Sequence, residues 1–179
     1  MCPFQIIANN HLKVYTYENF SQIIRKDIDF ITEKYDEQGF VFWSKRDDTF
    51  VICYNEHYPF HSIRWTLMHE LAHIFLGHTT KTNILKLHSK KNKLFEVEAE
   101  SLAKHLLCPT VVLLECKILE ITEIMYICAV NETVAFNQST YLNNIKDLKY
   151  INNLEKLIKS QFYIFIKNYL KLRNKNRST

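Results

Sequence analysis

A short segment in the middle of the chain, RWTLMHELAHIFLGH (64–78), combines histidine and glutamate at a spacing that can do chemistry. His69 and His73 lie four residues apart, so on a helix both imidazoles project from the same face and can reach one metal ion. Glu70 is turned by about 100° from His69, which places its carboxylate beside such an ion rather than on it. An ion held there lowers the pKa of a water molecule toward about 7, and a neighbouring glutamate can take up the proton during attack on a carbonyl. The segment therefore predicts a hydrolytic metal site with Glu70 as its base.

Apart from its histidines and glutamate, the predicted helix is apolar on nearly every side. A helix that is apolar nearly all round is buried, and burying two histidines and a glutamate without partners costs free energy. A bound metal removes that cost, which favours a metal site over the alternative, a surface helix that carries histidines by chance. The apolar neighbours are Ile63, Trp65, Leu67, Met68, Leu71, Ile74, Phe75 and Leu76.

A catalytic zinc site needs a third protein ligand, because such a site takes three and leaves one position open for water. The ligand does not follow directly downstream, since Leu76 and Thr79 stand where a metzincin has a glycine and its third histidine. The segment EVEAESLAKHLLCP (96–109) offers three acids on a predicted helix instead.

The position of each acid around the helix axis indicates which of them can face the two histidines. Glu98 lies on the side of the helix opposite to Glu96, whereas Glu100 lies next to Glu96 and one turn on. We therefore predict Glu96 as the third ligand, Glu100 as a neighbour that could hold a histidine, and Glu98 as facing solvent. The alternative is that Glu96 is a surface acid paired with Lys104 or another neighbour. The small and apolar residues on the side of Glu96, which argue against that alternative, are Ala99, Ala103 and Leu107.

The elements that must position these residues follow from periodicity. Apolar spacing predicts an amphipathic helix over 17–37 that ends before Gly39, and two β-branched and aromatic runs predict a hairpin over about 39–55. The histidine helix is expected to begin at a Ser62 cap and to stop at Gly77. Residues 79–93 are polar and aperiodic, and a further helix should occupy about 94–107.

The remainder of the chain is predicted to be helical. A helix-turn-helix-like pair over 121–142 is capped in its middle by Asn131, and a basic amphipathic helix covers 147–173. We expect a core over 1–109 that carries the metal site and a helical region over 110–179 that packs on it as one unit.

Composition limits the class of protein. The chain has 179 residues, 47% of them hydrophobic, with only two glycines, which favours one mostly helical core. Residues 156–179 carry seven of the 23 basic residues and no acid, so the rest of the chain is mildly acidic. Five cysteines without a paired spacing indicate free thiols, and neither a signal peptide nor a membrane span is apparent. A cytoplasmic protein without a membrane partner is expected.

Both helices of the site, together with the hairpin before them, resemble the ImmA/IrrE family of metallopeptidases. The residues that carry the resemblance are ICYN, IRWTLMHELAHIFLGH and EVEAESLAKHLLCP, and it covers about 39–109 and weakly extends to 142. The family's usual residues are replaced at several positions, but the predicted ligands and base are not. The replacing residues are Ala72, Glu100, Leu102 and Cys108, with Asn137 or Gln138 in place of an arginine.

The resemblance implies an α+β, mostly helical fold with a gluzincin-like minimal core, a small antiparallel sheet and C-terminal helices. It implies zinc, with manganese as an alternative, held by His69, His73 and Glu96 with Glu70 as base. It also implies a substrate, a helix-turn-helix repressor whose cleavage derepresses a mobile element, prophage or stress genes. No sensor domain fits into 143–179, so the likeness is to the short members.

Two rival functions remain at this stage. The scaffold could bind a repressor without cleaving it, although a purely structural metal site would need no base at Glu70. Direct DNA binding through 121–142 and the basic C-terminal segment is disfavoured, because the segment TVAFNQSTYL has neither arginine nor lysine. The residue that stabilises the oxyanion stays open among Tyr54, His61 and His78, and so does the oligomeric state.

Overall fold

The computed structural model describes residues 2–79, 92–147 and 153–175. Contacts divide the chain into two compact units, residues 1–107 and 108–179, each of which we describe by itself. The sequence placed the division two residues later, after Pro109. That the two regions pack as one unit stays a prediction.

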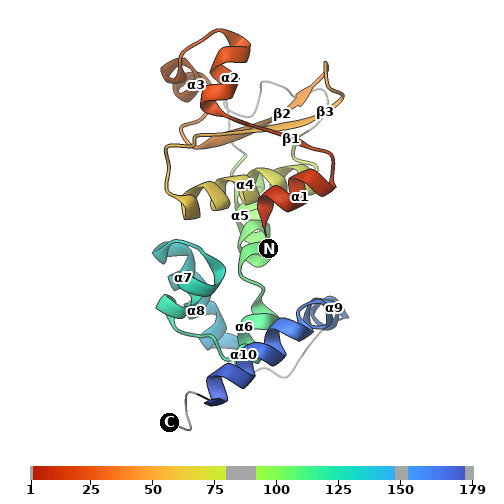
Figure 1. Ribbon diagram of the computed structural model, residues 1–179, viewed down its shortest axis with the longest axis vertical. Coiled ribbons are helices and arrows are strands. Elements are labelled where there is room, and N and C mark those ends of the chain that lie inside the picture. The colour runs from red at the N-terminus through yellow and green to blue at the C-terminus, as the bar shows by residue number, and fades with distance from the viewer. Residues whose placement is uncertain (1, 80–91, 148–152, 176–179) are drawn as a thin grey trace. The chain divides into compact units, whose positions relative to one another are not determined.

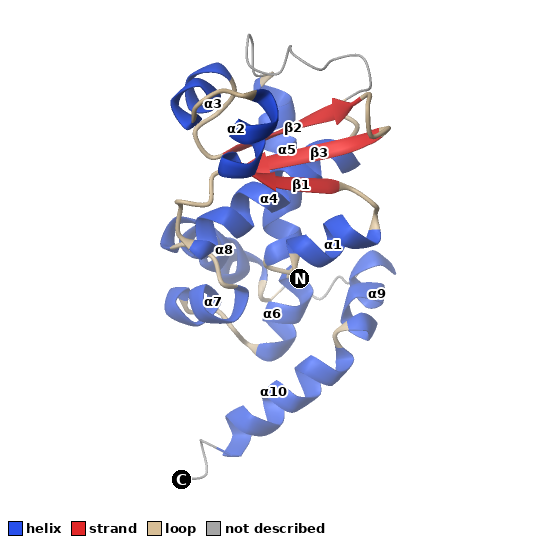
Figure 2. Ribbon diagram, turned by 45° about the horizontal axis from the view of Figure 1, so that its top comes forward, coloured by secondary structure: helices blue, strands red, loops and turns tan. Residues whose placement is uncertain are grey.

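A three-stranded mixed sheet forms the centre of the first unit (Figure 2). Strands β2 (Gly39–Ser44) and β3 (Thr49–Tyr54) make the predicted hairpin, with Gly39 opposite Tyr54. Strand β1 (Lys13–Thr16) adds to the other side of β3 in parallel, in the order β1-β3-β2. The predicted antiparallel hairpin is therefore confirmed, and the unpredicted β1 makes the sheet mixed. Strand β1 was not predicted because it has only four residues, and no local pattern indicates its distant partner.

Helices cover both faces of the sheet (Figure 1). Helices α2 (Tyr17–Ile24) and α3 (Ile28–Lys34) lie over one face, and α1 (Pro3–Asn9) and α4 (Phe60–Phe75) lie over the other. Helix α5 (Lys93–Leu107) packs along α4.

The single helix predicted over 17–37 is two helices in the structure. Arg25 adopts a left-handed conformation at φ 54°, which ends α2. The carboxylate of Asp27 then accepts a hydrogen bond from the backbone N–H of Phe30 at 2.8 Å and begins α3. The apolar period continues across the break, so the pattern alone did not reveal it.

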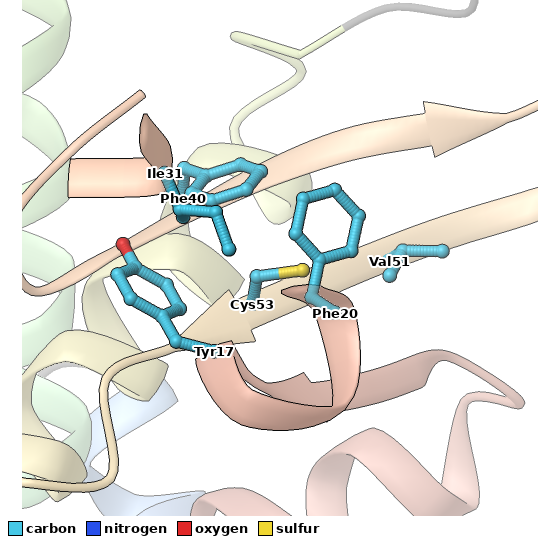
Figure 3. Close-up of a cluster of buried hydrophobic side chains, with 6 residues drawn as sticks. All are labelled: Tyr17, Phe20, Ile31, Phe40, Val51 and Cys53. Atoms are coloured by element: carbon cyan, nitrogen blue, oxygen red, sulfur yellow. The ribbon is translucent and has the colours of Figure 1, made fainter. Parts of the chain in front are cut away.

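An aromatic core joins α2 and α3 to the sheet (Figure 3). Phe20 packs edge-on against Phe40, with ring centroids 5.6 Å apart, and Tyr35 stacks on Phe40 at 4.5 Å. The hydroxyl of Tyr17 donates a hydrogen bond to the backbone oxygen of Asp36 at 2.6 Å, which satisfies the one polar atom of that buried ring. The buried members of the cluster are Tyr17, Phe20, Ile31, Phe40, Val51 and Cys53.

The two helices of the predicted site form close to their expected positions. Helix α4 begins after Pro59 rather than at a Ser62 cap, so the predicted cap residue lies in its first turn. The helix ends at Phe75, and Gly77 follows at φ 71°. Helix α5 matches the predicted range of 94–107 to within one residue. Of the polar segment predicted over 79–93, residues 80–91 lie outside the described part of the chain.

The second unit is helical in all of its described elements. Helices α7 (Ile121–Cys128) and α8 (Glu132–Ile145) form the expected pair, and the side chain of Asn131 accepts a hydrogen bond from the N–H of Val134 at 2.9 Å. The fully buried amide of Gln138 donates to the backbone oxygen of Cys108, at 3.2 Å. The remaining helices are α6 (Thr110–Cys116), α9 (Asn153–Gln161) and α10 (Tyr163–Lys175).

The long amphipathic helix predicted over 147–173 is also two helices, with a break at Phe162 between α9 and α10. Ile166 is buried, whereas Leu154 and Phe165 are exposed. Among the described residues, no helix is long and apolar enough to cross a membrane.

Candidate metal centre

Helix α4 presents His69 and His73 one turn apart on the same face, as the spacing predicted. Their Nε2 atoms lie 3.0 Å apart, and the two rings are nearly perpendicular at 83°. The side chain of His73 is 3% exposed and that of His69 is 16% exposed. Two imidazole nitrogens are therefore aimed at one point near the surface of the first unit.

The third donor comes from α5. One carboxylate oxygen of Glu96 lies 3.4 Å from Nε2 of His69, and the other lies 3.7 Å from Nε2 of His73. Ala99 and Ala103 are fully buried on α5, as the helical phase predicted, and their small side chains let α5 approach α4 closely. Among the described residues, these three side chains form the group with metal-ligand spacing, with all donor atoms within 4.8 Å of one another.

This donor set fits a metal ion by both chemistry and distance. Two imidazole nitrogens and one carboxylate oxygen are a ligand set of catalytic zinc sites. Ligands about 2.0–2.1 Å from a tetrahedral ion lie about 3.3 Å from one another. The observed separations of 3.0, 3.4 and 3.7 Å bracket that value.

Comparison with known families agrees with this geometry. Residues 23–126 match a peptidase family described as the IrrE N-terminal-like domain. The chain belongs to this family. No curated protein and no solved structure matches the chain.

A further carboxylate, that of Glu70, lies beside the candidate ligands. Its carboxylate follows His69 in the chain, is 9% exposed, and is not one of the three side chains with ligand spacing. It opens into a cavity of about 340 Å³ that His69 and Glu96 also line. The other lining residues are Asp36, Glu37, Gln38, Gly39, Trp65, Thr66 and Glu100.

Gly39 allows strand β2 to approach the site, a role that the sequence does not reveal because a glycine at this place predicts only a helix end. A β-carbon at Gly39 would lie 2.4 Å from Cγ2 of Thr66 on α4 and 2.9 Å from the backbone oxygen of Cys53. Only glycine fits at this contact between the strand and the histidine helix.

None of the three oxyanion candidates lines the cavity. Tyr54 packs edge-on against Phe4, with ring centroids 6.0 Å apart, and burial together with the Glu56 carboxylate raises the pKa of its hydroxyl. His61 lies in the first turn of α4, roughly 12 Å along the helix axis from His69 at 1.5 Å per residue. His78 contacts the far side of His73 instead.

Two acids of α5 have surroundings that the prediction did not include. Glu98 is exposed, as expected, with 45% of its side chain accessible, and its carboxylate also lies 3.1 Å from Nε2 of His78. Glu100 was expected to hold a histidine, but it is exposed at the cavity, and His78 takes that position against His73. The helical phase predicted for α5 was right. The turn after α4 brings His78 against α5, and the periodicity of one helix cannot predict a contact with another segment.

Cys53 does not take part in the site, because its side chain belongs to the aromatic core under α2 and α3. The side chain is fully buried in strand β3, and burial raises the pKa of its thiol, an effect that the nearby Glu70 carboxylate increases. The thiol therefore stays protonated at neutral pH, and only the thiolate is a metal ligand.

Proposed function

We propose that this protein is a zinc-dependent endopeptidase that cleaves a helix-turn-helix transcriptional repressor and so derepresses a mobile element, prophage or stress genes. Peptidase chemistry is supported by family membership and by the arrangement of His69, His73 and Glu96. The repressor as substrate is what the resemblance to the ImmA/IrrE family implies.

The observation that carries the proposal is the position of Glu70. A metal site that only stabilises a fold has no need of a further carboxylate at its open side. Here a carboxylate that is 9% exposed lies beside a ligand position and opens into the same cavity as Glu96. That is the position from which a general base can take a proton from an attacking water.

His69, His73 and Glu96 would hold the zinc ion. When bound, zinc acts as a Lewis acid on the scissile carbonyl and lowers the pKa of a water molecule. Glu70 accepts the proton of the attacking water and passes it to the leaving amine. The carboxylate is preorganised for both transfers, because it is carried by the same rigid helix that carries two of the ligands.

The cavity also limits how a substrate can bind. Gln38 and Gly39 line it at the beginning of β2, which is an edge strand of the described sheet. An exposed strand edge can pair with an extended peptide through backbone hydrogen bonds. The substrate should therefore present an unfolded or linker segment, rather than a helix, at the bond that is cut.

The test is Glu70→Gln, which keeps the shape of the side chain and removes the base. General acid–base assistance is worth about 10²–10⁴-fold, so co-expression with the cognate repressor should give fragments with the wild type and intact repressor with the variant. Metal analysis should show the same metal content in both proteins, because the three ligands remain.

The rival function is a module that binds a repressor without cutting it. Exposed apolar side chains on α9 and α10, among them Ile164 at 72% and Leu172 at 62%, favour a protein partner of some kind. If wild type and Glu70→Gln relieve repression equally and no fragment forms, the binding function is correct and the peptidase proposal is wrong.

A further inference from the structure

A further histidine, His78, and a further glutamate, Glu98, lie in series behind the candidate metal centre. Nδ1 of His73, on the side of the ring away from His69 and Glu96, is 3.1 Å from Nδ1 of His78. Nε2 of His78 is in turn 3.1 Å from a carboxylate oxygen of Glu98. The side chains of His73 and His78 are 3% and 4% exposed, so both rings of the series are shielded from water.

The turn after α4 brings His78 to this place. The backbone N–H of Gly77 donates to the oxygen of Ile74 at 3.1 Å, and that of His78 donates to the oxygen of His73 at 2.9 Å. These two bonds, with Gly77 at φ 71°, form a Schellman motif that ends the helix. The motif reverses the chain, so the ring of His78 lies against the ring of His73.

Helix α5 holds the ring of His78 from the other side. Phe95 stacks on it with centroids 4.2 Å apart and planes 6° from parallel, and Glu98 contacts its edge. Phe95 and Glu98 lie within two residues of Glu96 on α5. The helix that supplies the candidate ligand Glu96 therefore also orients His78, the residue behind His73.

Counting donors and acceptors leaves one consistent arrangement of protons for neutral rings. An ionised carboxylate only accepts, so Nε2 of His78 must carry its hydrogen and donate to Glu98. Nδ1 of His78 is then an acceptor, and Nδ1 of His73 must donate to it. Nε2 of His73 is left with a lone pair, aimed at the point where Nε2 of His69 and the carboxylate of Glu96 also meet.

We infer that His78, anchored by Glu98, is a positioning residue that holds His73 in the tautomer and orientation that can bind a metal ion. The inference rests on the proposed function for the ion, but the tautomer of His73 can be measured without any metal. Groups that orient a metal-binding histidine in this way typically change metal affinity by about 10- to 100-fold when they are removed.

The first test is His78→Phe, which keeps a ring to stack on Phe95 and removes both ring nitrogens. We expect the dissociation constant for Zn²⁺, measured by competition with a chelator, to rise by about 10- to 100-fold. In the metal-free protein, two-bond ¹H–¹⁵N correlation spectra should show His73 with its hydrogen on Nδ1 in the wild type. In the variant, the hydrogen should move partly or wholly to Nε2, the commoner form of a free imidazole.

The matched pair is Glu98→Ala and Glu100→Ala, because both remove one carboxylate from α5 but only Glu98 contacts His78. Glu98→Ala should weaken zinc binding and change the spectrum of His73, and Glu98→Gln should restore part of both, since an amide oxygen can still accept from His78. Glu100→Ala should change neither. Glu98 is 45% exposed, so its replacement tests the inference even if His78→Phe does not fold.

The inference is overturned if folded His78→Phe or Glu98→Ala binds zinc with wild-type affinity and keeps the wild-type tautomer of His73. It is also overturned if Glu100→Ala has the same effects as Glu98→Ala, because charge alone would then explain both. A wild-type protein that binds no metal would contradict the proposed function, and the tautomer of His73 would still decide whether His78 positions it.

Discussion

The three candidate ligands form a site only because side chains from two helices meet at one point. His69 and His73 are close together because they are one turn apart on α4, but Glu96 reaches them from a separate helix. The two Nε2 atoms are 3.0 Å apart, so two imidazole nitrogens and a carboxylate share a small volume. A cation bound between them would be a common partner for all three groups.

Replacing single ligands should therefore remove the metal. We expect His69→Ala and Glu96→Ala to lose most of the roughly one transition metal per chain that the wild type should carry. Elemental analysis of the purified proteins checks this and also distinguishes zinc from manganese. Glu100→Gln, on the same helix but outside the ligand group, is the control and should retain the metal. Full metal content in both alanine variants would refute the ligand assignment.

Among the elements, the contact between β2 and α4 controls the position of the histidine helix. Gly39→Ala would place a methyl group 2.4 Å from Cγ2 of Thr66 and 2.9 Å from the oxygen of Cys53. Overpacking of this kind typically lowers the free energy of unfolding by about 1–3 kcal/mol. Denaturant unfolding of the variant measures the effect.

A double variant identifies the cause. Thr66→Ser removes Cγ2 and keeps the hydroxyl, so Gly39→Ala with Thr66→Ser should recover part of the lost stability, but not all, because the backbone oxygen of Cys53 remains. Thr66→Ser alone is the reference for this comparison. Additive effects of the two substitutions would show that the contact is not the cause.

The beginning of α2 is tied to the loop after β3 by Glu56. Its carboxylate accepts hydrogen bonds from the backbone N–H groups of Tyr17 at 2.9 Å and Glu18 at 3.1 Å. Burial opposes ionisation, but these bonds prevail and lower the pKa of Glu56 below its ordinary value of 4.5. A carboxyl with a lowered pKa in the folded state stabilises the fold above its unfolded pKa, and the contribution is lost as the pH falls.

We therefore expect the stability of the metal-free protein to fall between about pH 5 and pH 3, and Glu56→Gln to reduce that dependence. Thermal unfolding at several pH values in the presence of a chelator measures it without interference from the metal ligands. Equal pH dependence in wild type and variant would mean that the bonds to α2 do not stabilise the ionised form.

On the scale of the whole molecule, each unit has its own source of stability. In the second unit, the guanidinium of Arg173 on α10 donates to the backbone oxygens of Cys116 and Lys117, both at 2.9 Å, at the end of α6. Ile166 on the same helix is buried, and Lys159 on α9 pairs with Glu115 at 2.5 Å. Helices α9 and α10 therefore cover α6 even though much of their outer surface is apolar and exposed.

A chain that ends at Asp147 should accordingly expose the apolar side of α6. We expect it to bind an apolar dye and to aggregate on heating, whereas its metal content should persist because the three candidate ligands belong to the first unit. Arg173→Ala in the full chain is a milder companion and should cost about 1–3 kcal/mol through its lost hydrogen bonds. A truncated chain that stays monomeric and equally heat-stable would contradict this role of α9 and α10.

The local features of this protein could be predicted from its sequence. The spacing of His69 and His73, the side of α5 that carries Glu96, the hairpin and the Asn131 cap all depend on residues within a few positions of one another. Helical and strand periodicity determine such features almost without reference to the rest of the chain.

Other features depended on contacts between distant segments. The parallel partner of β1 lies 38 residues away, as Lys13 beside Val51 shows, and no local pattern names it. The helix breaks at Arg25 and Phe162 occur within continuous apolar periods, because the backbone can turn there without losing the buried face. Glu98 and His78 are 20 residues apart, and they meet only because a Schellman turn and the packing of α5 on α4 bring them together. Spacing along one helix can predict a ligand such as His73. The residues that contact its other side, His78 and Glu98, depend on tertiary packing.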